Sequence, residues 1–339
     1  MFASSFFLGK KKVGPGNPAL VIAEAGVAHF GDPEKADILV DMAVSSGADV
    51  FKTQAFITEQ LVSGNSPEWR ERLKPKEVDY PFLRRMKDRC DRHDLLFMCT
   101  AHDEQSLKWV NDLDAPCYKI GSGERGNIPF LSKIAARGKP ILLSTGMHRK
   151  DDISLVLKTV SAAGCRELAL LHCVTCYPTP YKDVNLMAMD SLRAMFPGPV
   201  GYSDHTEGCD AALAAVARGS QIIEKHITLD FNVHNAQDWK VSVGQDDLVK
   251  LVRRIRDIEA MMGDGVLDVM PCEQPALIWA LKSLVACRDL AAGTVLTSDM
   301  ILAKRPGIGL APTELKNVIG RRLRESVAAD QPITQDSLI

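Results

Sequence analysis

Short apolar segments alternate with amphipathic segments along most of the chain. Segments such as 32–47 and 151–164 place apolar residues at helical spacing and end on a glycine, which is typical of surface helices. The short apolar runs between such segments predict buried strands. There are eight of these runs, at 19–26, 48–54, 95–101, 115–122, 140–146, 167–175, 199–206 and 220–228.

Strands that alternate with helices pair in parallel, and eight such units favour a (β/α)₈ TIM barrel over an open doubly wound sheet. The ends of the runs support this prediction. A parallel strand that is buried on both faces should be uniformly apolar, yet every run finishes on polar residues. An active site at the carboxyl ends of barrel strands requires such residues. They are Glu24, Lys52 with Gln54, Thr100, Lys119 with Ser122, Ser144 with Thr145, His172 with Thr175, Ser203 with His205, and Glu224 with His226.

The alternation of strand and helix signals ends near residue 276. Beyond that point the chain has short β-like runs, turn dipeptides and only small helical pieces. We therefore predict a barrel domain over 13–264, a linker over 265–280 and a small β-rich domain over 281–339.

Two of the apolar runs end on a histidine. In a barrel, His205 and His226 cap the seventh and eighth strands, which are neighbours, so both imidazoles can reach one point. Two neutral imidazoles, with waters and the carboxylate of Glu24, suit a divalent first-row metal with open coordination positions. Two histidines that only hydrogen-bond within the protein are the alternative.

Two lysines lie near the ends of other runs. Lys52 and Lys119, together with hydroxyl groups at neighbouring strand ends, predict a clamp for a phosphate or a carboxylate. The hydroxyl groups belong to Thr100, Ser122, Ser144 and Ser203. A Schiff-base aldolase instead needs one desolvated lysine, and Lys119 is the candidate for that role.

The composition limits the kinds of partner that the protein is expected to bind. The formal net charge is −2 over 339 residues, and the isoelectric point is near 6.5, so no nucleic-acid or acidic-membrane partner is expected. Nine scattered cysteines indicate a reducing compartment. The first lysines follow an apolar stretch, the reverse of a signal peptide, and no apolar run approaches the length of a membrane span. We expect a cytoplasmic protein with small-molecule substrates.

Several short motifs occur together in one order. They are "IAEAG", "FKTQ", "YKIGSGE", "LLSTGM", "LLHC", "YPTP", "GYSDHT" and "EKHITLD". This set resembles the sialic acid synthase family, which makes N-acetylneuraminate and related nonulosonic acids. The terminal "DLAAGTVLTSDMILAKRPGIGL" resembles the antifreeze-like SAF domain of those enzymes. The resemblance extends from about residue 13 to the C-terminus.

The resemblance implies a phosphoenolpyruvate-dependent, C–C bond-forming transferase. Its reaction is the metal-dependent condensation of phosphoenolpyruvate with an N-acyl-mannosamine-type aldose, which gives a nonulosonic acid and phosphate. The metal of the family, usually Mn²⁺, matches His205 and His226, and the family's catalytic glutamate matches Glu24. The phosphoenolpyruvate contacts match Lys52, Thr100, Lys119, Ser122, Ser144, Thr175 and Ser203. The sugar contacts match Gln54, Tyr177, Asp238 and Arg305. In the family, the terminal domain completes the active site of the partner in a homodimer.

The departures from the family pattern lie mainly at residues that the resemblance assigns to sugar binding. Thr175 stands where many relatives have asparagine or serine, and Asp238 lies in a loop without the usual glycine-proline-aspartate pattern. The stretch between Lys52 and Thr100 is also shorter than usual. Two other functions stay open, namely a Schiff-base aldolase that uses Lys119 and a non-catalytic sugar-binding protein.

Overall fold

The computed structural model describes residues 1–233, 236 and 238–339. The chain divides into two compact units, Met1–Gly263 and Asp264–Ile339. In the part of the chain that the structure describes, no helix is long and apolar enough to cross a membrane.

The first unit is a closed barrel of parallel strands. Its hydrogen-bonded order is β10-β3-β4-β5-β6-β7-β8-β9, so β10 pairs with β3 and closes the ring. The TIM-barrel prediction is therefore confirmed. The strands are β3 (Leu20–Gly26), β4 (Val50–Ala55), β5 (Leu96–Ala101), β6 (Tyr118–Ile120), β7 (Ile141–Ser144), β8 (Leu168–His172), β9 (Val200–Asp204) and β10 (Ile222–His226).

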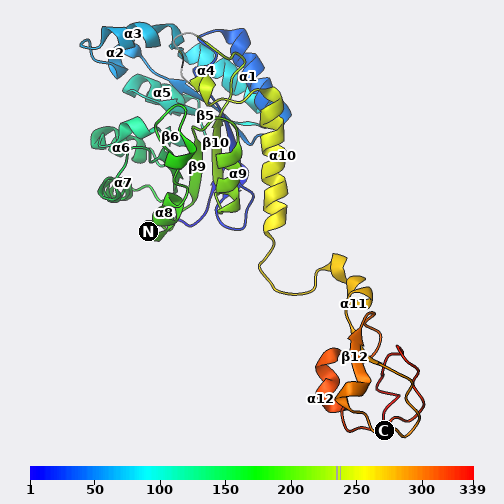
Figure 1. Cartoon of the computed structure of the whole chain (residues 1–339). Helices are drawn as coiled ribbons and strands as arrows, with labels where there is room; N and C mark the ends of the chain where they lie inside the picture. The colour runs from blue at the N-terminus through cyan, green and yellow to red at the C-terminus, as the bar shows by residue number, and fades with distance from the viewer. Residues whose placement is uncertain (234–235, 237) are drawn as a thin grey trace. The chain divides into compact units, whose positions relative to one another are not determined.

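Helices lie around the outside of these strands (Figure 1). The first of them shows how the sequence sets their limits. The side chain of Asp32 accepts hydrogen bonds from the backbone of Glu34 and Lys35, and Gly47 ends the helix with a φ of 76°. The helices are α1 (Pro33–Ser46), α4 (Tyr80–Arg92), α5 (Glu104–Asp112), α6 (Ile128–Ala135), α7 (Lys150–Ala162), α8 (Ala188–Met195), α9 (Asp210–Ala217) and α10 (Gln245–Met262).

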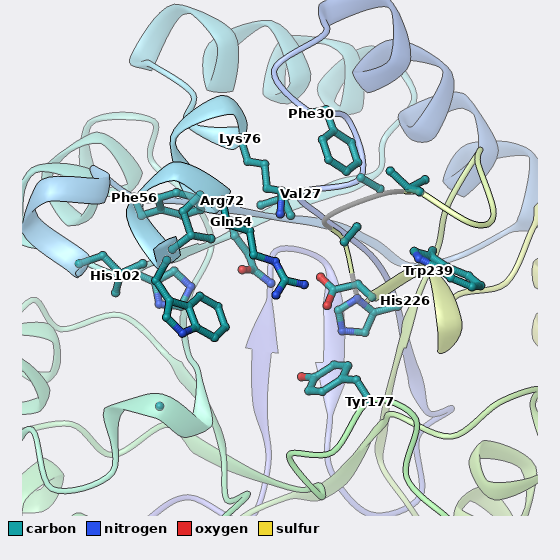
Figure 2. A pocket seen from close by; sticks show the side chains of 18 of the residues that line it. Val27, Phe30, Gln54, Phe56, Arg72, Lys76, His102, Tyr177, His226 and Trp239 are labelled. Atoms are coloured by element: carbon teal, nitrogen blue, oxygen red, sulfur yellow. The ribbon is translucent and has the colours of Figure 1, made fainter. Parts of the chain in front are cut away.

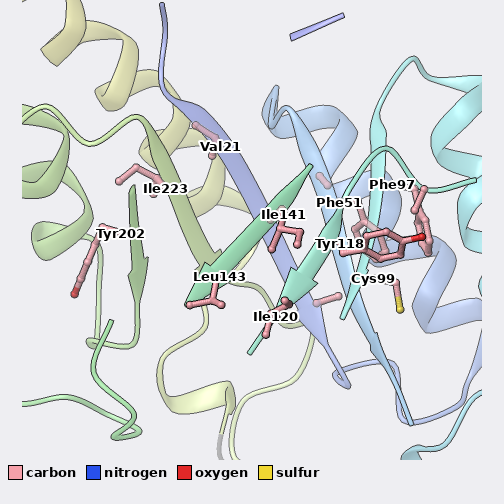
Figure 3. Packing of buried hydrophobic residues seen from close by; sticks show 14 of the residues in the cluster. Val21, Phe51, Phe97, Cys99, Tyr118, Ile120, Ile141, Leu143, Tyr202 and Ile223 are labelled. Carbon is pink, nitrogen blue, oxygen red and sulfur yellow. The ribbon is translucent and has the colours of Figure 1, made fainter. Parts of the chain in front are cut away.

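Two apolar clusters stabilise the barrel. The larger one lies between strands and helices and includes Phe51, Phe97 and Tyr118, which Figure 3 shows close together. The smaller one fills the amino-terminal half of the barrel interior, where strand residues such as Ile22 and Met98 meet the N-terminal hairpin. That hairpin consists of β1 (Phe6–Leu8) and β2 (Lys11–Val13). The amino-terminal end of the barrel is thus closed by apolar packing, and the polar residues gather at the other end.

The connection between β4 and α4 carries three further short helices. They are α2 (Thr58–Leu61), α3 (Pro67–Leu73) and the 3₁₀ turn η1 (Lys74–Lys76). Because this connection follows the carboxyl end of β4, it lies at the end of the barrel where a substrate is bound in this fold.

The second unit has its own small core. Its antiparallel strands β11 (Ser283–Ala286) and β12 (Ile301–Lys304) pair with each other, and short helices α11 (Ala276–Trp279) and α12 (Leu315–Val318) flank them in sequence. Leu284, Leu296 and Leu323 belong to its apolar cluster. Each unit therefore buries a hydrophobic core of its own, as an independent domain must.

Candidate active site

Four charged side chains form a buried network inside the barrel at the carboxyl ends of its strands. Lys52 Nζ lies 3.2 Å from Glu24 Oε1 and 3.2 Å from Glu224 Oε2. Lys119 Nζ lies 3.6 Å from Glu224 Oε1. All four side chains are almost fully buried, so their charges act on one another with little screening by solvent.

Hydroxyl groups complete this network. Lys119 Nζ donates to Ser144 Oγ at 2.7 Å, and Lys52 Nζ donates to Thr100 Oγ1 at 3.5 Å. Ser203 Oγ donates to Glu224 Oε1 at 2.9 Å. The structure thus brings together six residues that the sequence analysis assigned to the site, namely Glu24, Lys52, Thr100, Lys119, Ser144 and Ser203.

Ion pairing sets the protonation of the two lysines differently. Burial opposes the charge of Lys52, but attraction by Glu224 and Glu24 outweighs it and raises the pKa of Lys52. For Lys119, burial is the largest effect and the neighbouring Lys52 adds to it, so the pKa of Lys119 is lowered. Burial also opposes the charge of Glu224, yet the two lysines hold its pKa well below the usual range. Lys52 is therefore a fixed cation, and Lys119 loses its proton more readily.

Glu224 is a central member of the network, and the sequence analysis named it only as a polar strand-end residue without a role. Successive side chains of a strand point to opposite faces, so Glu224 and His226 share one face of β10 while Lys225 lies on the other. Once His226 is placed inside the barrel, this period of two also places Glu224 there. That alternation was the available signal.

The two predicted histidines lie side by side. Their ring centroids are 5.5 Å apart. The Nδ1 of His205 donates to the carbonyl of Val174 at 2.8 Å, which leaves Nε2 with a lone pair that accepts from the Tyr177 hydroxyl at 3.0 Å. Burial lowers the pKa of His226 to about 3, so its ring is neutral. The buried Nδ1 of His226 has no hydrogen-bond partner among the described residues.

These two imidazoles are suited to be ligands of a divalent metal ion that keeps other coordination positions open. Both rings are neutral, as metal ligation requires, and the carbonyl of Val174 fixes the ring of His205 in the way that a second partner fixes metal-ligating histidines. Within the described residues, no cluster of three or more histidine, cysteine or carboxylate side chains has a metal-binding arrangement. The protein would thus supply two nitrogen ligands and leave the other positions to substrate or water.

A chamber of about 430 Å³ opens beside the histidines. Four predicted residues line it, namely Gln54, Tyr177, His226 and Asp238. Figure 2 shows His226 and Tyr177 near each other, with Gln54 on the side of β4. A Cβ atom at Gly26 would lie 3.4 Å from Asp238 Oδ2, 3.5 Å from Gln54 Nε2 and 3.6 Å from Glu24 Oε1. Two of the predicted sugar contacts, Gln54 and Asp238, therefore lie close to the predicted catalytic carboxylate.

Ser122 and Thr175 lie together at a neighbouring part of the rim. Ser122 Oγ accepts from the backbone of Gly146 at 3.0 Å and lies 3.1 Å from Cys173 Sγ. A Cβ atom at Gly146 would lie only 2.3 Å from Thr175 Oγ1 and 2.7 Å from Ser122 Oγ. The absence of a side chain at Gly146 thus lets these two hydroxyl groups come together.

A second buried ion pair supports the loop that carries His205. Lys225 Nζ donates to Asp204 Oδ2 at 2.9 Å and to the carbonyl of Thr206 at 2.8 Å. Asp204 Oδ1 in turn accepts from the Tyr202 hydroxyl and from Thr206. Asp204 and Lys225 are both fully buried, so this network fixes the backbone on either side of His205.

Lys225→Met is expected to lower the free energy of unfolding by about 3–5 kcal/mol, because Asp204 then remains buried without its cation. Urea denaturation followed by circular dichroism measures the change. The matched control is Lys250→Met, which removes an exposed, solvent-screened ion pair with Asp247 and should change stability little. Equal, small changes for the two variants would contradict a structural role for the buried pair.

Arg305 lies in the second unit, directly after β12. Its guanidinium carbon is 5.8 Å from the ring centroid of Trp279, which belongs to the same unit. The expected contact of Arg305 with the sugar, and the homodimer in which it would occur, stay predictions.

Two family models match the chain. The NeuB family model matches residues 39–267, and the SAF domain model matches residues 282–339. The chain belongs to the NeuB family. The resemblance drawn from the short motifs is thereby confirmed, as is a terminal SAF domain.

Members of the NeuB family that resemble this chain are synthases of nonulosonic acids. An N,N'-diacetyllegionaminic acid synthase of Campylobacter jejuni is 35% identical and aligns over 93% of this chain and 99% of its own length. The human N-acetylneuraminate-9-phosphate synthase is 30% identical over 96% of this chain and 94% of its own length.

A solved structure of the NeuB family has the same fold. It is the N-acetylneuraminic acid synthetase of Leptospira borgpetersenii, determined in complex with citrate. It is 33% identical, covers 80% of this chain and 95% of its own, and superimposes with a TM-score of 0.76. A 3-deoxy-D-arabino-heptulosonate 7-phosphate synthase of Thermotoga maritima, at 19% identity and a TM-score of 0.62, shares the fold.

Proposed function

We propose that this protein condenses phosphoenolpyruvate with an N-acyl-mannosamine-type aldose to form a nonulosonic acid and phosphate. The observation that carries the proposal is the buried network of Lys52, Lys119 and Glu24 next to the paired histidines and the chamber. It combines cations for an anionic donor, a carboxylate for proton transfer, and space for a sugar. The family relatives, which are nonulosonic acid synthases, support the same reaction.

The lysines and hydroxyl groups would bind phosphoenolpyruvate. The donor carries a carboxylate and a phosphate, and charge-assisted hydrogen bonds from ammonium groups hold such anions best. Lys52 and Lys119 supply these charges, and Ser144 and Thr100 already contact them. Ser122, Thr175 and Ser203 add hydroxyl groups at the same strand ends. Burial of the network makes each contact stronger than it would be in water.

His205 and His226 would hold a divalent metal ion, which we propose is Mn²⁺. Such an ion, when bound, polarises a carbonyl oxygen as a Lewis acid. The tautomer of His205 supports this assignment, since its carbonyl partner leaves Nε2 with a lone pair that faces the Tyr177 hydroxyl.

Glu24 would move a proton during the reaction. The electron pair of the C2=C3 double bond of phosphoenolpyruvate forms a bond from C3 to the aldehyde carbon, the carbonyl electron pair of the aldehyde moves to its oxygen, and C2 becomes cation-like. Water adds to C2 and loses a proton to Glu24, which returns that proton to the aldehyde oxygen as it becomes a hydroxyl group. The bond between C2 and the bridging oxygen then breaks, the C2 hydroxyl becomes the keto group, and its proton leaves with the phosphate. A carboxylate with one oxygen free of hydrogen bonds within the described residues is suited to accept the proton of water.

A Schiff-base aldolase is the second candidate, because burial lowers the pKa of Lys119. Borohydride treatment in the presence of a carbonyl substrate distinguishes the two functions. We expect no adduct on Lys119 by mass spectrometry. A trapped adduct on Lys119, together with activity that is independent of phosphoenolpyruvate, would show that the protein is a Schiff-base aldolase and not the proposed synthase.

The proposed function is tested by phosphate release across a panel of aldoses. We expect release only when phosphoenolpyruvate and an N-acyl-mannosamine-type acceptor are both present. Saturable binding without release for every acceptor would favour a non-catalytic sugar-binding protein.

Lys52→Met and Lys119→Met are each expected to lower kcat/KM for phosphoenolpyruvate about tenfold to a hundredfold. A hydrogen bond to a charged group contributes about 1.5–3 kcal/mol, which corresponds to that factor. KM for the aldose should change little. Steady-state kinetics with either substrate varied measures both effects, and exposed Lys108→Met is the matched control. A defect confined to the aldose would refute the assignment of these lysines to the donor.

A further inference from the structure

One histidine that lines the chamber has no role in the reaction steps assigned to Glu24 and the lysines. His102 directly follows β5, and its backbone N–H donates to the carbonyl of Ala55 at 3.1 Å, which continues the pairing of β5 with β4. Because side chains alternate along such a ladder, His102 shares a face with Thr100, a member of the lysine network. Its side chain is thereby directed into the chamber, which it lines.

The ring of His102 lies on the side of the chamber away from the paired histidines. Its centroid is 6.4 Å from that of Phe56, and a Cβ atom at Gly121 would lie 3.7 Å from its Cε1. Gly121 directly precedes Ser122, whose hydroxyl group is assigned to phosphoenolpyruvate. Figure 2 shows His102 beside Phe56, with His226 across the chamber. His102 is therefore close to the proposed phosphoenolpyruvate contacts and apart from the proposed metal ligands.

The surroundings of His102 keep its ring neutral. The pKa of His102 is lowered to about 4, first by burial and then by the positive charges of Lys52 and Lys119, while Asp103 acts in the opposite direction. A neutral imidazole has one N–H donor and one lone pair. Within the described residues, no hydrogen bond or ion pair engages this ring, which packs against Phe56. The N–H of His102 can therefore donate to a ligand in the chamber.

The shape of phosphoenolpyruvate limits which of its groups can reach His102. Its C2 carbon is bonded to the C3 carbon, to the carboxylate and to the oxygen of the phosphate ester. Under the proposed function, C3 is the atom nearest to the aldehyde, which lies at His205 and His226. Both anionic groups are attached through C2, so they lie farther from the paired histidines, toward the lysines and the wall that holds His102.

The burial of the hydroxyl groups separates the two anionic groups. Ser144 and Ser203 are only 2% and 1% exposed, whereas Ser122 is half-buried and Thr175 is exposed. Phosphate is released during the reaction, so it needs a part of the site that is open to solvent. The phosphate group therefore fits the rim at Ser122, next to His102, and the carboxylate fits the buried hydroxyl groups.

We infer that the imidazole N–H of His102 donates a hydrogen bond to the phosphate group of phosphoenolpyruvate. This inference rests on the proposed function and adds a substrate-binding residue to it. A hydrogen bond to an anion is stronger than one between neutral groups, and burial of the site reduces the competition from water. His102 thus holds the leaving group in place, together with the lysines, while C3 reacts.

His102→Phe keeps an aromatic ring beside Phe56 but removes both ring nitrogens. We expect its Kd for phosphoenolpyruvate, measured by isothermal titration without aldose, to rise about tenfold to a hundredfold, the range for loss of a hydrogen bond to a charged group. KM for the aldose should change little. His102→Gln, which keeps a side-chain N–H, should recover most of the binding. The matched control is His93→Phe, at an exposed position, which should bind as the wild type does.

Inorganic phosphate and pyruvate distinguish the two anionic groups, because each carries only one of them. In displacement titrations against phosphoenolpyruvate, His102→Phe should weaken binding of phosphate about tenfold or more and leave binding of pyruvate unchanged. Circular dichroism of all variants confirms that each is folded. The inference is wrong, while the proposed function stands, if phosphoenolpyruvate binding is unchanged, if His102→Gln loses as much binding as His102→Phe, or if pyruvate is affected as much as phosphate. If the wild type binds no phosphoenolpyruvate, the proposed function fails instead.

Discussion

His226→Ala is expected to abolish turnover and to remove metal binding while the protein stays folded. The imidazole of His226 is one of the two predicted nitrogen ligands, and the described residues contain no group of three or more metal-binding side chains that could replace it. Its buried Nδ1 makes no hydrogen bond within the described residues, so its removal breaks none there. Treatment of the wild type with EDTA should likewise abolish activity, and Mn²⁺ should restore it.

Isothermal titration with Mn²⁺ gives a readout that does not depend on activity. The wild type should bind one ion per chain, and His226→Ala should bind none with comparable affinity. His93→Ala, at an exposed position after α4, is the control and should behave as the wild type. Full activity in chelator, or equal Mn²⁺ binding by the wild type and His226→Ala, would contradict the metal site.

Glu24→Gln is expected to lower kcat by about a hundredfold or more, the range for loss of general-base or electrostatic assistance. Glutamine has nearly the same shape but neither the charge nor the basicity. Stability should change little, because Lys52 keeps a carboxylate partner at 3.2 Å in Glu224. Pre-steady-state and steady-state phosphate release measure the effect, and exposed Glu104→Gln is the control. An unchanged kcat would reduce Glu24 to a structural residue.

The arrangement of the barrel was predictable because strand, helix and loop signals repeat along the chain. The gathering of the polar strand-end residues at one end was predictable too, since the carboxyl ends of parallel strands meet at one end of a closed barrel. The inward direction of single side chains was harder to predict. Glu224 and Lys225 are adjacent, and only the alternation from His226 indicates which of them faces the interior; the pairing of Lys225 with Asp204 agrees with it.

Two parts of the structure could not be predicted, because their sequence pattern is too short to identify secondary structure. The strands of the N-terminal hairpin have only three residues each, which is too short for a recognisable alternation. The helices α2 and α3 have four and seven residues, and their packing against the chamber depends on tertiary contacts. Only the structure therefore shows that Arg72 and Lys76 line the chamber.

The central claim is that phosphoenolpyruvate reacts as a carbon nucleophile and that water adds at its C2 carbon. The most direct test is a reaction with phosphoenolpyruvate that carries ¹⁸O in the bridging position, followed by mass spectrometry of both products. We expect a 2-keto acid three carbons longer than the acceptor and ¹⁸O in the released phosphate, since the bond between C2 and the bridging oxygen breaks. Unlabelled phosphate, or phosphate formed without the lengthened acid, would contradict the account.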